Sequence, residues 1–152
     1  MIEEKYMKAA IKQAKLGEKY DEVPVGVVIV KDGKIIARAH NQKEKKNCAN
    51  YHAEMAAIEK ACKVVGNWRL IGCDVYVTLE PCPMCTGAFI NARVDNIYFG
   101  AFDKKAGCLG SVYNLMEDGK FNHKAGVHGG ILEKECANIL TEYFKGKRGK
   151  QW

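Results

Sequence analysis

The sequence predicts an α/β protein in which helices cover a mixed sheet. Hydrophobic spacing predicts a first helix and then the order β, β, α, β, α, β, β, α, which is typical of that class. The chain has 152 residues, of which 47% are hydrophobic, so it is long enough for one buried core. We see no internal repeat and no linker that would divide it. We therefore expect residues 1–152 to form one domain.

The first part of the chain contains a predicted helix, a hairpin and a loop. Apolar residues recur at helical spacing from Met7 to Ala14, and Gly17 is predicted to end this helix. Residues 25–30 and 34–39 are apolar runs on either side of a tight-turn dipeptide, which predicts a hairpin. Residues 42–50 have no apolar period and carry three lysines, so we expect an exposed loop there.

The next helix is predicted to open near Tyr51 or His52 and to end by Gly66. We expect its inner face to carry Met55, Ile58, Cys62 and Val65. The stretch 101–123 is rich in glycine and turn formers, which predicts a long connection. The other predicted elements are strands at 73–79, 95–100 and 127–131, a short helix at 83–92, and a last helix marked by Leu132, Cys136, Ile139, Leu140 and Tyr143.

Composition favours a cytoplasmic protein. No segment approaches the roughly 20 consecutive apolar residues that a membrane helix requires, and the first ten residues lack the apolar stretch of a secretory signal. We therefore expect no membrane partner. The seven cysteines are an odd number without the spacing of a disulfide framework, which favours reduced thiols or metal ligands.

The charge distribution suggests a polyanionic partner. The formal net charge is +6, and residues 145–152 carry four basic residues and no acid directly after the last predicted helix. This end of the chain is either a nucleic-acid contact or a solvated, frayed tail. Its basic residues are Lys145, Lys147, Arg148 and Lys150.

Two short segments carry a predicted metal site. His52-Ala53-Glu54 and Pro81-Cys82-Pro83-Met84-Cys85 each stand at the start of a predicted helix. The two cysteines are three residues apart, so one helical turn places both sulfurs on the same side. The positive end of the helix and a metal ion would both favour thiolates. His52, Cys82 and Cys85 are therefore predicted to bind zinc.

The ligand set favours a catalytic zinc site over a structural one. Two thiolates and one imidazole leave the fourth tetrahedral position for water, and the sequence has no second CxxC or HxxxH pattern to fill it. Glu54 is predicted to move protons as general base and acid. Taken separately, a CxxC pair can be redox-active or merely buried, and a lone histidine is usually a satisfied polar residue. The combination of HxE with PCxxC is more specific, and it is the signature of the zinc deaminases.

Further segments resemble a known family over nearly the whole chain. They are Glu22 to Gly26, His40-Asn41, Asn67 to Leu70, Val77 to Cys85, Phe99 to Ala101, Lys105 to Gly107, Gly110-Ser111 and Phe121 to His123. With the zinc motifs, they resemble the tRNA adenosine deaminase branch of the cytidine-deaminase-like superfamily. One segment departs from that family: Cys48-Ala49-Asn50-Tyr51 stands where similar proteins usually have Asp-Pro-Thr-Ala, so substrate preference is where we expect differences.

The resemblance implies a three-layer α/β/α fold with a mixed five-stranded sheet. It also implies a homodimer with one Zn²⁺ per subunit, no organic cofactor, and pockets completed by the neighbouring subunit. The implied reaction is hydrolysis at adenine C6 of a tRNA anticodon stem-loop, which releases ammonia and leaves inosine. By the same resemblance Asn41 would bind the inserted nucleoside. Backbone N–H groups near Ala53 and Cys82 are predicted to orient the reacting oxygen.

A base that is stacked in RNA must be splayed out to reach such a pocket, so flanking nucleotides need contacts of their own. Asn122 and His123 are predicted to bind substrate. The predicted RNA contacts are Lys43, Lys45, Lys46, Lys105, Lys145, Lys147, Arg148 and Lys150.

Two alternatives stay open. One is a deaminase of the same fold that acts on free guanine, cytosine or cytidine. The other is a zinc-stabilised RNA-binding module without turnover, for which Glu54 would have no use. Trp68 is interpreted as core or dimer packing, and four further cysteines are interpreted as buried packing residues. These are Cys62, Cys73, Cys108 and Cys136.

Overall fold

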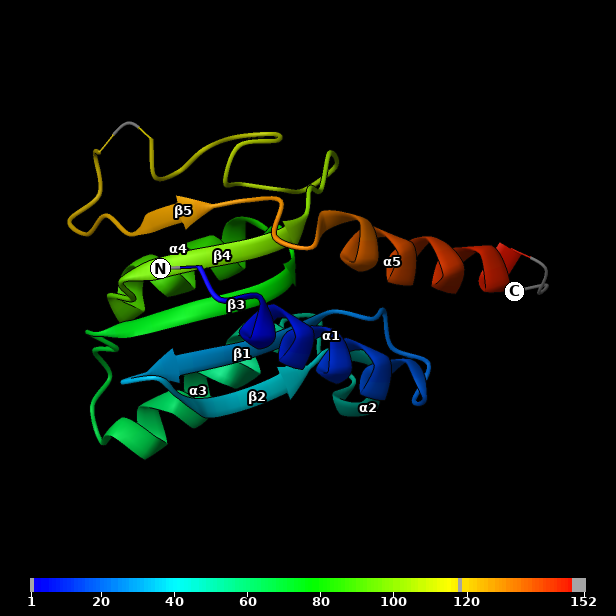
Figure 1. Cartoon of the computed structure of the whole chain (residues 1–152), viewed down its shortest axis with the longest axis horizontal. Coiled ribbons are helices and arrows are strands. Elements are labelled where there is room, and N and C mark those ends of the chain that lie inside the picture. Colours follow the sequence, from blue (N-terminus) through cyan, green and yellow to red (C-terminus); the bar gives the residue numbers. More distant parts are fainter. Residues whose placement is uncertain (1, 118, 149–152) are drawn as a thin grey trace.

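The computed structural model describes residues 2–117 and 119–148. It shows a mixed five-stranded sheet with helices on both faces, which confirms the predicted class (Figure 1). The strand order is β2-β1-β3-β4-β5. The elements are α1 (Glu4–Glu18), β1 (Gly26–Lys31), β2 (Lys34–His40), α2 (Lys43–Lys46), α3 (Ala53–Val65), β3 (Cys73–Leu79), α4 (Pro83–Ala92), β4 (Asn96–Ala101), β5 (Gly126–His128) and α5 (Glu133–Arg148).

The sheet topology brings the starts of two helices to one edge. β1 is antiparallel to both β2 and β3, so β2 and β3 run in the same direction. β4 runs parallel to β3. The carboxyl ends of β2, β3 and β4 therefore share one edge of the sheet, where open α/β sheets usually bind their ligands. The segments that lead into α3 and α4 leave from this edge.

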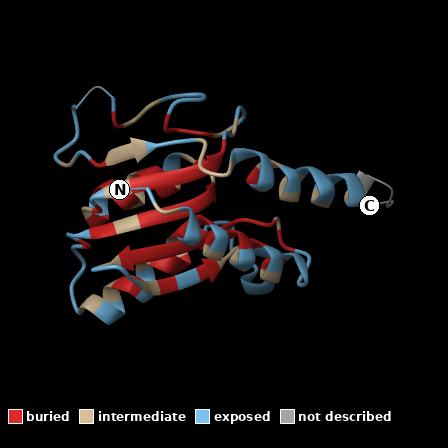
Figure 2. Cartoon of the chain, viewed as in Figure 1, coloured by how far each residue is buried: buried red, intermediate tan, exposed pale blue. Residues whose placement is uncertain are grey.

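The core has two halves, one on each face of the sheet. Val27, Ile29 and Val77 pack with residues of α3 and α4, whereas Val28 and Tyr76 pack with residues of α1. Because both faces are covered, β1 is almost continuously apolar. Figure 2 shows the central strands buried along most of their length, while the outer part of α5 is exposed. None of the helices formed by the described residues is both long and apolar enough to cross a membrane.

Gly26 lets α1 pack directly on β1. A Cβ at this position would fall on the backbone of Ala10 and Ala14. We expect Gly26→Ala to destabilise the protein by about 2 kcal/mol or more, because neither backbone can move without repacking the core. Urea unfolding of the variant measures this loss. Gly146→Ala is the matched control: no atom lies near the added methyl group, so no loss is expected. Equal stability of the two variants would contradict the close packing.

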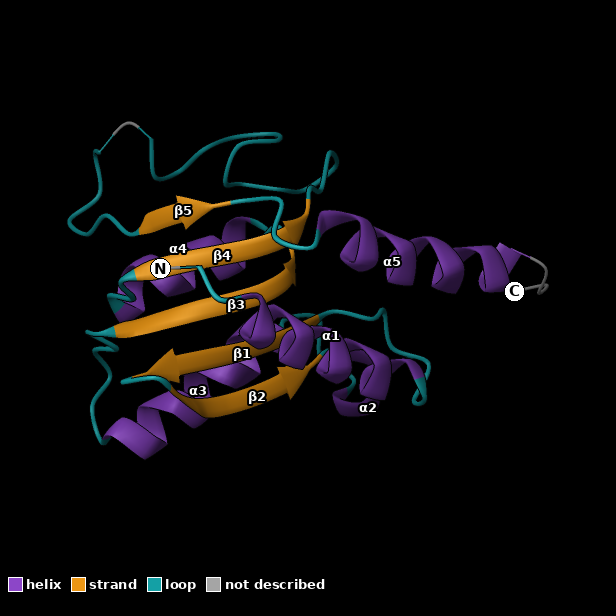
Figure 3. Cartoon of the chain, in the orientation of Figure 1, coloured by secondary structure: helices purple, strands orange, loops and turns teal. Residues whose placement is uncertain are grey.

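Four details of the sequence prediction need correction. Gly17 does not end α1: the helix continues to Glu18, and Gly17 is buried at a close contact with His40. The segment 42–50 is exposed as predicted but contains the short helix α2. β5 is only three residues long, and Figure 3 shows the long connection that leads to it from β4.

The fourth correction concerns the inner face of α3. The buried residues of this helix are Glu54 and alanines, whereas Met55, Ile58, Cys62 and Val65 are only half-buried. Small side chains allow the helix to lie close to the sheet. The larger apolar residues lie at the margin of the contact, and three of them still pack against the core.

Candidate active site

The first turns of α3 and α4 bring the predicted metal ligands together. His52 is the N-cap of α3 and Cys82 is the N-cap of α4, and both have extended backbone conformations. Pro83 occupies the first turn of α4, where its missing N–H is not needed. Cys85 follows one turn later. Both helices lie on the same side of the sheet, so their N-termini meet at the carboxyl ends of β2 and β3 (Figure 1).

The donor atoms fit a zinc ion. His52 Nδ1 lies 3.8 Å from Cys82 Sγ and 3.6 Å from Cys85 Sγ. Zn–N and Zn–S bonds of about 2.0 and 2.3 Å in a tetrahedron place such atoms about 3.5 Å apart. Among the described residues, these are the one group of three or more His, Cys, Asp and Glu side chains whose ligating atoms all lie within 4.8 Å of one another. The residues therefore match a three-ligand zinc site.

The three candidate ligands are linked by hydrogen bonds whose protons a bound cation would displace. Hydrogen bonds from Cys85 and His52 lower the pKa of Cys82 to about 4. The pKa of the Cys85 thiol is raised because it donates to Cys82 and is buried. The pKa of His52 is raised, mainly by its hydrogen bond with Cys82. A divalent cation would displace these protons, as metal binding to thiols and imidazoles does in general.

Glu54 lies beside the ligands without belonging to their group. Glu54 is buried, with only 4% of the residue exposed. Burial raises the pKa of Glu54 to about 7. A carboxylic acid whose pKa is near neutrality can both take and return a proton under ordinary conditions. The site thus combines three side chains that can hold a metal ion with a buried carboxyl group that can carry a proton.

Asn41 connects the end of β2 to the start of α3. Its side-chain Oδ1 accepts the Ala53 N–H at 2.9 Å, and its own N–H donates to the Val25 carbonyl at 3.2 Å. Asn41 and Ala53 therefore lie together next to His52 and Glu54. In this structure the Ala53 N–H is bonded to Asn41, so its predicted role toward the reacting oxygen stays a prediction.

Comparisons with known proteins agree with this arrangement of side chains. The family described as the cytidine and deoxycytidylate deaminase zinc-binding region matches residues 1–101 of the chain. The chain belongs to this deaminase family. It is similar to a tRNA-specific adenosine deaminase of Bacillus subtilis, with 52% identity over 149 residues that cover 98% of this chain and 92% of that protein.

Two solved structures are similar to this member of the deaminase family. One comes from biochemical and structural studies of A-to-I editing by tRNA:A34 deaminases at the wobble position of transfer RNA. It has a TM-score of 0.87 and 40% identity, and the match covers 91% of this chain and all (100%) of that chain. The other is a guanine deaminase from Bacillus subtilis, with a TM-score of 0.63 and 42% identity over 67% of this chain and 66% of that one.

The predicted RNA-contact lysines of this deaminase-family chain fall on two segments near the site and on α5. Lys43, Lys45 and Lys46 form most of α2 and are exposed. Lys105 is exposed on the connection after β4. Lys145 is exposed on α5, of which Arg148 is the last residue. Lys150 lies outside the described residues. The structure thus leaves the RNA contacts as predictions.

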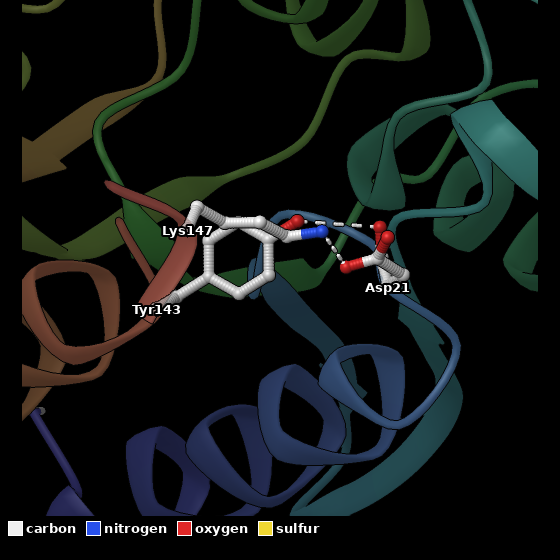
Figure 4. A network of polar contacts seen from close by, with 3 residues as sticks. All are labelled: Asp21, Tyr143 and Lys147. Carbon is white, nitrogen blue, oxygen red and sulfur yellow. Dashed lines mark hydrogen bonds and ion pairs between the residues drawn. The ribbon is translucent and has the colours of Figure 1, made fainter. Parts of the chain in front are cut away.

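Lys147 has a partner within the chain. It forms an ion pair with Asp21, and the Tyr143 hydroxyl donates to the Asp21 backbone carbonyl at 3.2 Å (Figure 4). The hydrogen bond with Asp21 raises the pKa of Lys147. These contacts tie the end of α5 to the segment between α1 and β1. An RNA phosphate would have to compete with Asp21 for this lysine.

The structure does not bring Asn122 and His123 to the metal ligands of the same chain. Asn122 is exposed, and His123 Nε2 lies 2.6 Å from the Val94 carbonyl, just beyond the C-terminal end of α4. The ligands lie at the other end of that helix. At 1.5 Å per residue, its ten residues span about 15 Å. Their substrate-binding role stays a prediction.

Several other residues can now be placed. Cys73, Cys108 and Cys136 are buried as predicted, whereas Cys62 is half-buried. Trp68 is not a core residue of the chain: it is 53% exposed, with Arg69 stacked 4.1 Å from its ring.

In the segment that departs from the family, Cys48 is exposed, while Tyr51 packs partly against the core. Lys46 lies 5.6 Å from the Tyr51 ring.

Two buried carboxylates, Glu22 and Glu80, were not predicted as functional residues from the sequence. Glu22 accepts hydrogen bonds from backbone N–H groups of α2, and Glu80 accepts them from the segment after β4. Each stands directly beside an apolar run that enters the core. An acid in that position must find several donors when it is buried, and this signal could have identified both residues.

Proposed function

We propose that this protein is a zinc-dependent hydrolase that converts adenosine to inosine at the wobble position of a tRNA anticodon. The observation that carries the proposal is the convergence of His52, Cys82 and Cys85 with the buried Glu54 beside them. Similarity to tRNA-specific adenosine deaminases along nearly the whole chain supports the substrate. Adenosine and water would give inosine and ammonia.

His52, Cys82 and Cys85 would hold the zinc ion, which supplies Lewis-acid activation of water when it is bound. Glu54 takes the proton of the attacking water. It then delivers protons to the ring nitrogen and to the departing amine, because its burial keeps both protonation states accessible near neutral pH. Asn41 shapes the start of α3 through its hydrogen bond with the Ala53 N–H, and its proposed role is to bind the inserted nucleoside.

The proposed substrate requires contacts beyond the flipped base. The exposed lysines of α2 and Lys105 are proposed to contact flanking phosphates. We further propose a cytoplasmic homodimer with one zinc per subunit and no organic cofactor, as the family resemblance implies.

A deaminase that acts on a free base is the second candidate. The similar guanine deaminase structure favours it, because that match has 42% identity. The match covers 67% of this chain, however, whereas the tRNA deaminase structure covers 91%. The zinc chemistry would be common to both, so only the substrate separates them.

Incubation of the pure protein with an unmodified tRNA pool tests the proposal. We expect sequencing to show inosine at an anticodon wobble adenosine. Ammonia release should stay at background with guanine, cytosine and cytidine. Ammonia from a free base without inosine in tRNA would establish the second candidate instead.

A further inference from the structure

Two buried carboxylates hold the lysine-bearing segments that border the candidate active site. Glu22 is 1% exposed and Glu80 is 2% exposed. Neither belongs to the metal-binding group. Each accepts hydrogen bonds from a segment more than twenty residues further along the chain.

Glu80 organises the segment 103–111. Its Oε1 accepts the Asp103 N–H at 3.0 Å and the Ser111 hydroxyl. Its Oε2 accepts the N–H groups of Leu109 and Ser111, each at 3.0 Å. A Cβ on Gly107 would fall on the carboxyl group itself. The segment is therefore folded closely around one carboxyl group.

The same segment touches the metal site and carries a predicted RNA contact. The Cys108 N–H donates at 2.9 Å to the carbonyl of Pro81, which precedes the ligand Cys82. The N–H of the exposed Lys105 donates at 3.0 Å to the Asp103 side chain, and Asp103 in turn is bonded to Glu80. A shift of this segment would therefore move Lys105 relative to the metal site.

Glu22 plays the corresponding part for α2. Its carboxylate accepts the N–H of Glu44 at 3.1 Å and that of Lys45 at 2.8 Å. The segment is tied to the metal site as well, since the Gln42 N–H donates to the carbonyl of Tyr51, which precedes His52. The backbone of α2, which carries three exposed lysines, is thus tied to the residue that precedes His52.

The two held segments border adjoining hollows on the surface. A hollow of 380 Å³ is lined by Glu44 of α2 together with Val23 and Phe144. A second hollow of 530 Å³ is lined by Lys105 and again by Val23 and Phe144. Because they share two lining residues, the hollows are neighbours. The backbone of α2 and the segment 103–111 therefore border one continuous region of the surface.

We infer that Glu22 and Glu80 are positioning residues for RNA recognition. They fix the two basic segments before RNA arrives, so binding does not have to order them. Changes at these two residues are therefore expected to alter the KM for RNA and to leave kcat unchanged. This inference rests on the proposed function, because it takes RNA as the substrate.

Glu80→Gln tests the inference in the zinc-loaded protein. The amide NH₂ would face backbone donors wherever it lies, so part of the segment loses its acceptor. We expect the KM for a tRNA anticodon stem-loop to rise about tenfold while kcat stays within about twofold. Glu22→Gln should act in the same direction.

Glu59→Gln is the matched control, because it removes one negative charge from an exposed carboxylate. Loss of negative charge alone strengthens RNA binding and lowers KM. The control is therefore expected to move KM slightly down, whereas the two buried variants move it up. The opposite signs separate positioning from net charge.

Amide hydrogen exchange gives a readout that does not depend on activity. In Glu80→Gln, the amides of Leu109 and Ser111 should exchange about tenfold faster while those of β3 do not change. In Glu22→Gln, the amides of Glu44 and Lys45 should respond in the same way. If Glu80→Gln does not fold, Ser111→Ala removes one donor and keeps the carboxylate, and a smaller rise in KM is expected.

Three results would overturn the inference: a fall in kcat at unchanged KM, loss of zinc, or kinetics equal to those of Glu59→Gln. If wild-type protein forms no inosine, the proposed function fails, and the RNA part of this inference fails with it. Normal wild-type activity combined with any of the three results overturns the inference alone.

Discussion

Glu54→Gln is expected to lower the rate of adenosine deamination by about 10³-fold, which is within the range for a lost general acid–base group. The amide keeps the shape of the buried side chain but cannot carry the proton between water, ring nitrogen and amine. Glu54 lies outside the metal-binding group, so zinc content should stay near one per chain. Single-turnover inosine formation and metal analysis of the same preparation measure both quantities.

The control for this variant lies on the same helix. Glu59 is exposed and pairs with Lys63 at 3.6 Å, so Glu59→Gln removes an equal charge from α3 and should retain activity. Activity retained in Glu54→Gln would remove Glu54 from the proton-carrying role. Zinc lost from Glu54→Gln would assign it to metal binding instead.

The stability of the zinc-free protein at different pH values gives a second test of the raised pKa of Glu54. Burial raises its pKa from 4.5 to about 7, so between these pH values the folded state holds a proton that the unfolded state has lost. Stability therefore falls as pH rises through this window, and the loss is complete above it. Zinc-free Glu54→Gln should be more stable than zinc-free wild type at pH 8 and about equal at pH 4. Urea unfolding at the two pH values measures the difference.

Local chemistry explains why much of the fold could be predicted. Strand β3 and helix α4 begin and end where the sequence predicts, because a β-branched and aromatic run ends at Glu80-Pro81 and Pro83 suits a first helical turn. The pairing of the two candidate cysteine ligands has a local reason as well. Cys82 and Cys85 are related by one helical turn, which fixes their geometry without reference to the rest of the chain.

The convergence of His52 with the cysteines is not a local property. It depends on β2 and β3 running in the same direction, which follows from the antiparallel pairing of both with β1. The two motifs nevertheless predict that these side chains lie together, because HxE and PCxxC in combination are specific to one kind of site, and the structure places the three side chains in one group. Residue spacing alone could not have given the 3.6 and 3.8 Å separations.

Helix α2 and the inner face of α3 could not be predicted because long-range contacts decide both. α2 has no apolar period. It depends on Glu22, whose carboxylate accepts hydrogen bonds from backbone N–H groups that lie 22 and 23 residues further along the chain. In α3, alanines take the inner positions because the helix lies close to the sheet. Apolar periodicity indicates which residues are hydrophobic, but it does not indicate how near two elements approach.

Removal of the metal is the second change with a large expected effect. Cys85→Ala takes away one of the three proposed zinc ligands, so we expect zinc content near zero and no detectable inosine. Cys62→Ala is the matched control: Cys62 is half-buried on α3 and lies outside the metal-binding group, so zinc and activity should both be retained. Metal analysis and inosine assays of the two variants, purified side by side, provide the measurement.

Chelation of the wild-type protein should silence it without unfolding it. The ligands lie at the first turns of α3 and α4, while the core beneath them is formed by residues of both helices and of the sheet. A core of this size does not need a metal to be stable, in contrast to small zinc modules. Far-UV circular dichroism should therefore stay unchanged, and added zinc should restore inosine formation. Cooperative unfolding on chelation would instead favour the zinc-stabilised binding module, because a catalytic ion placed at the edge of a complete core is not needed to hold that core together.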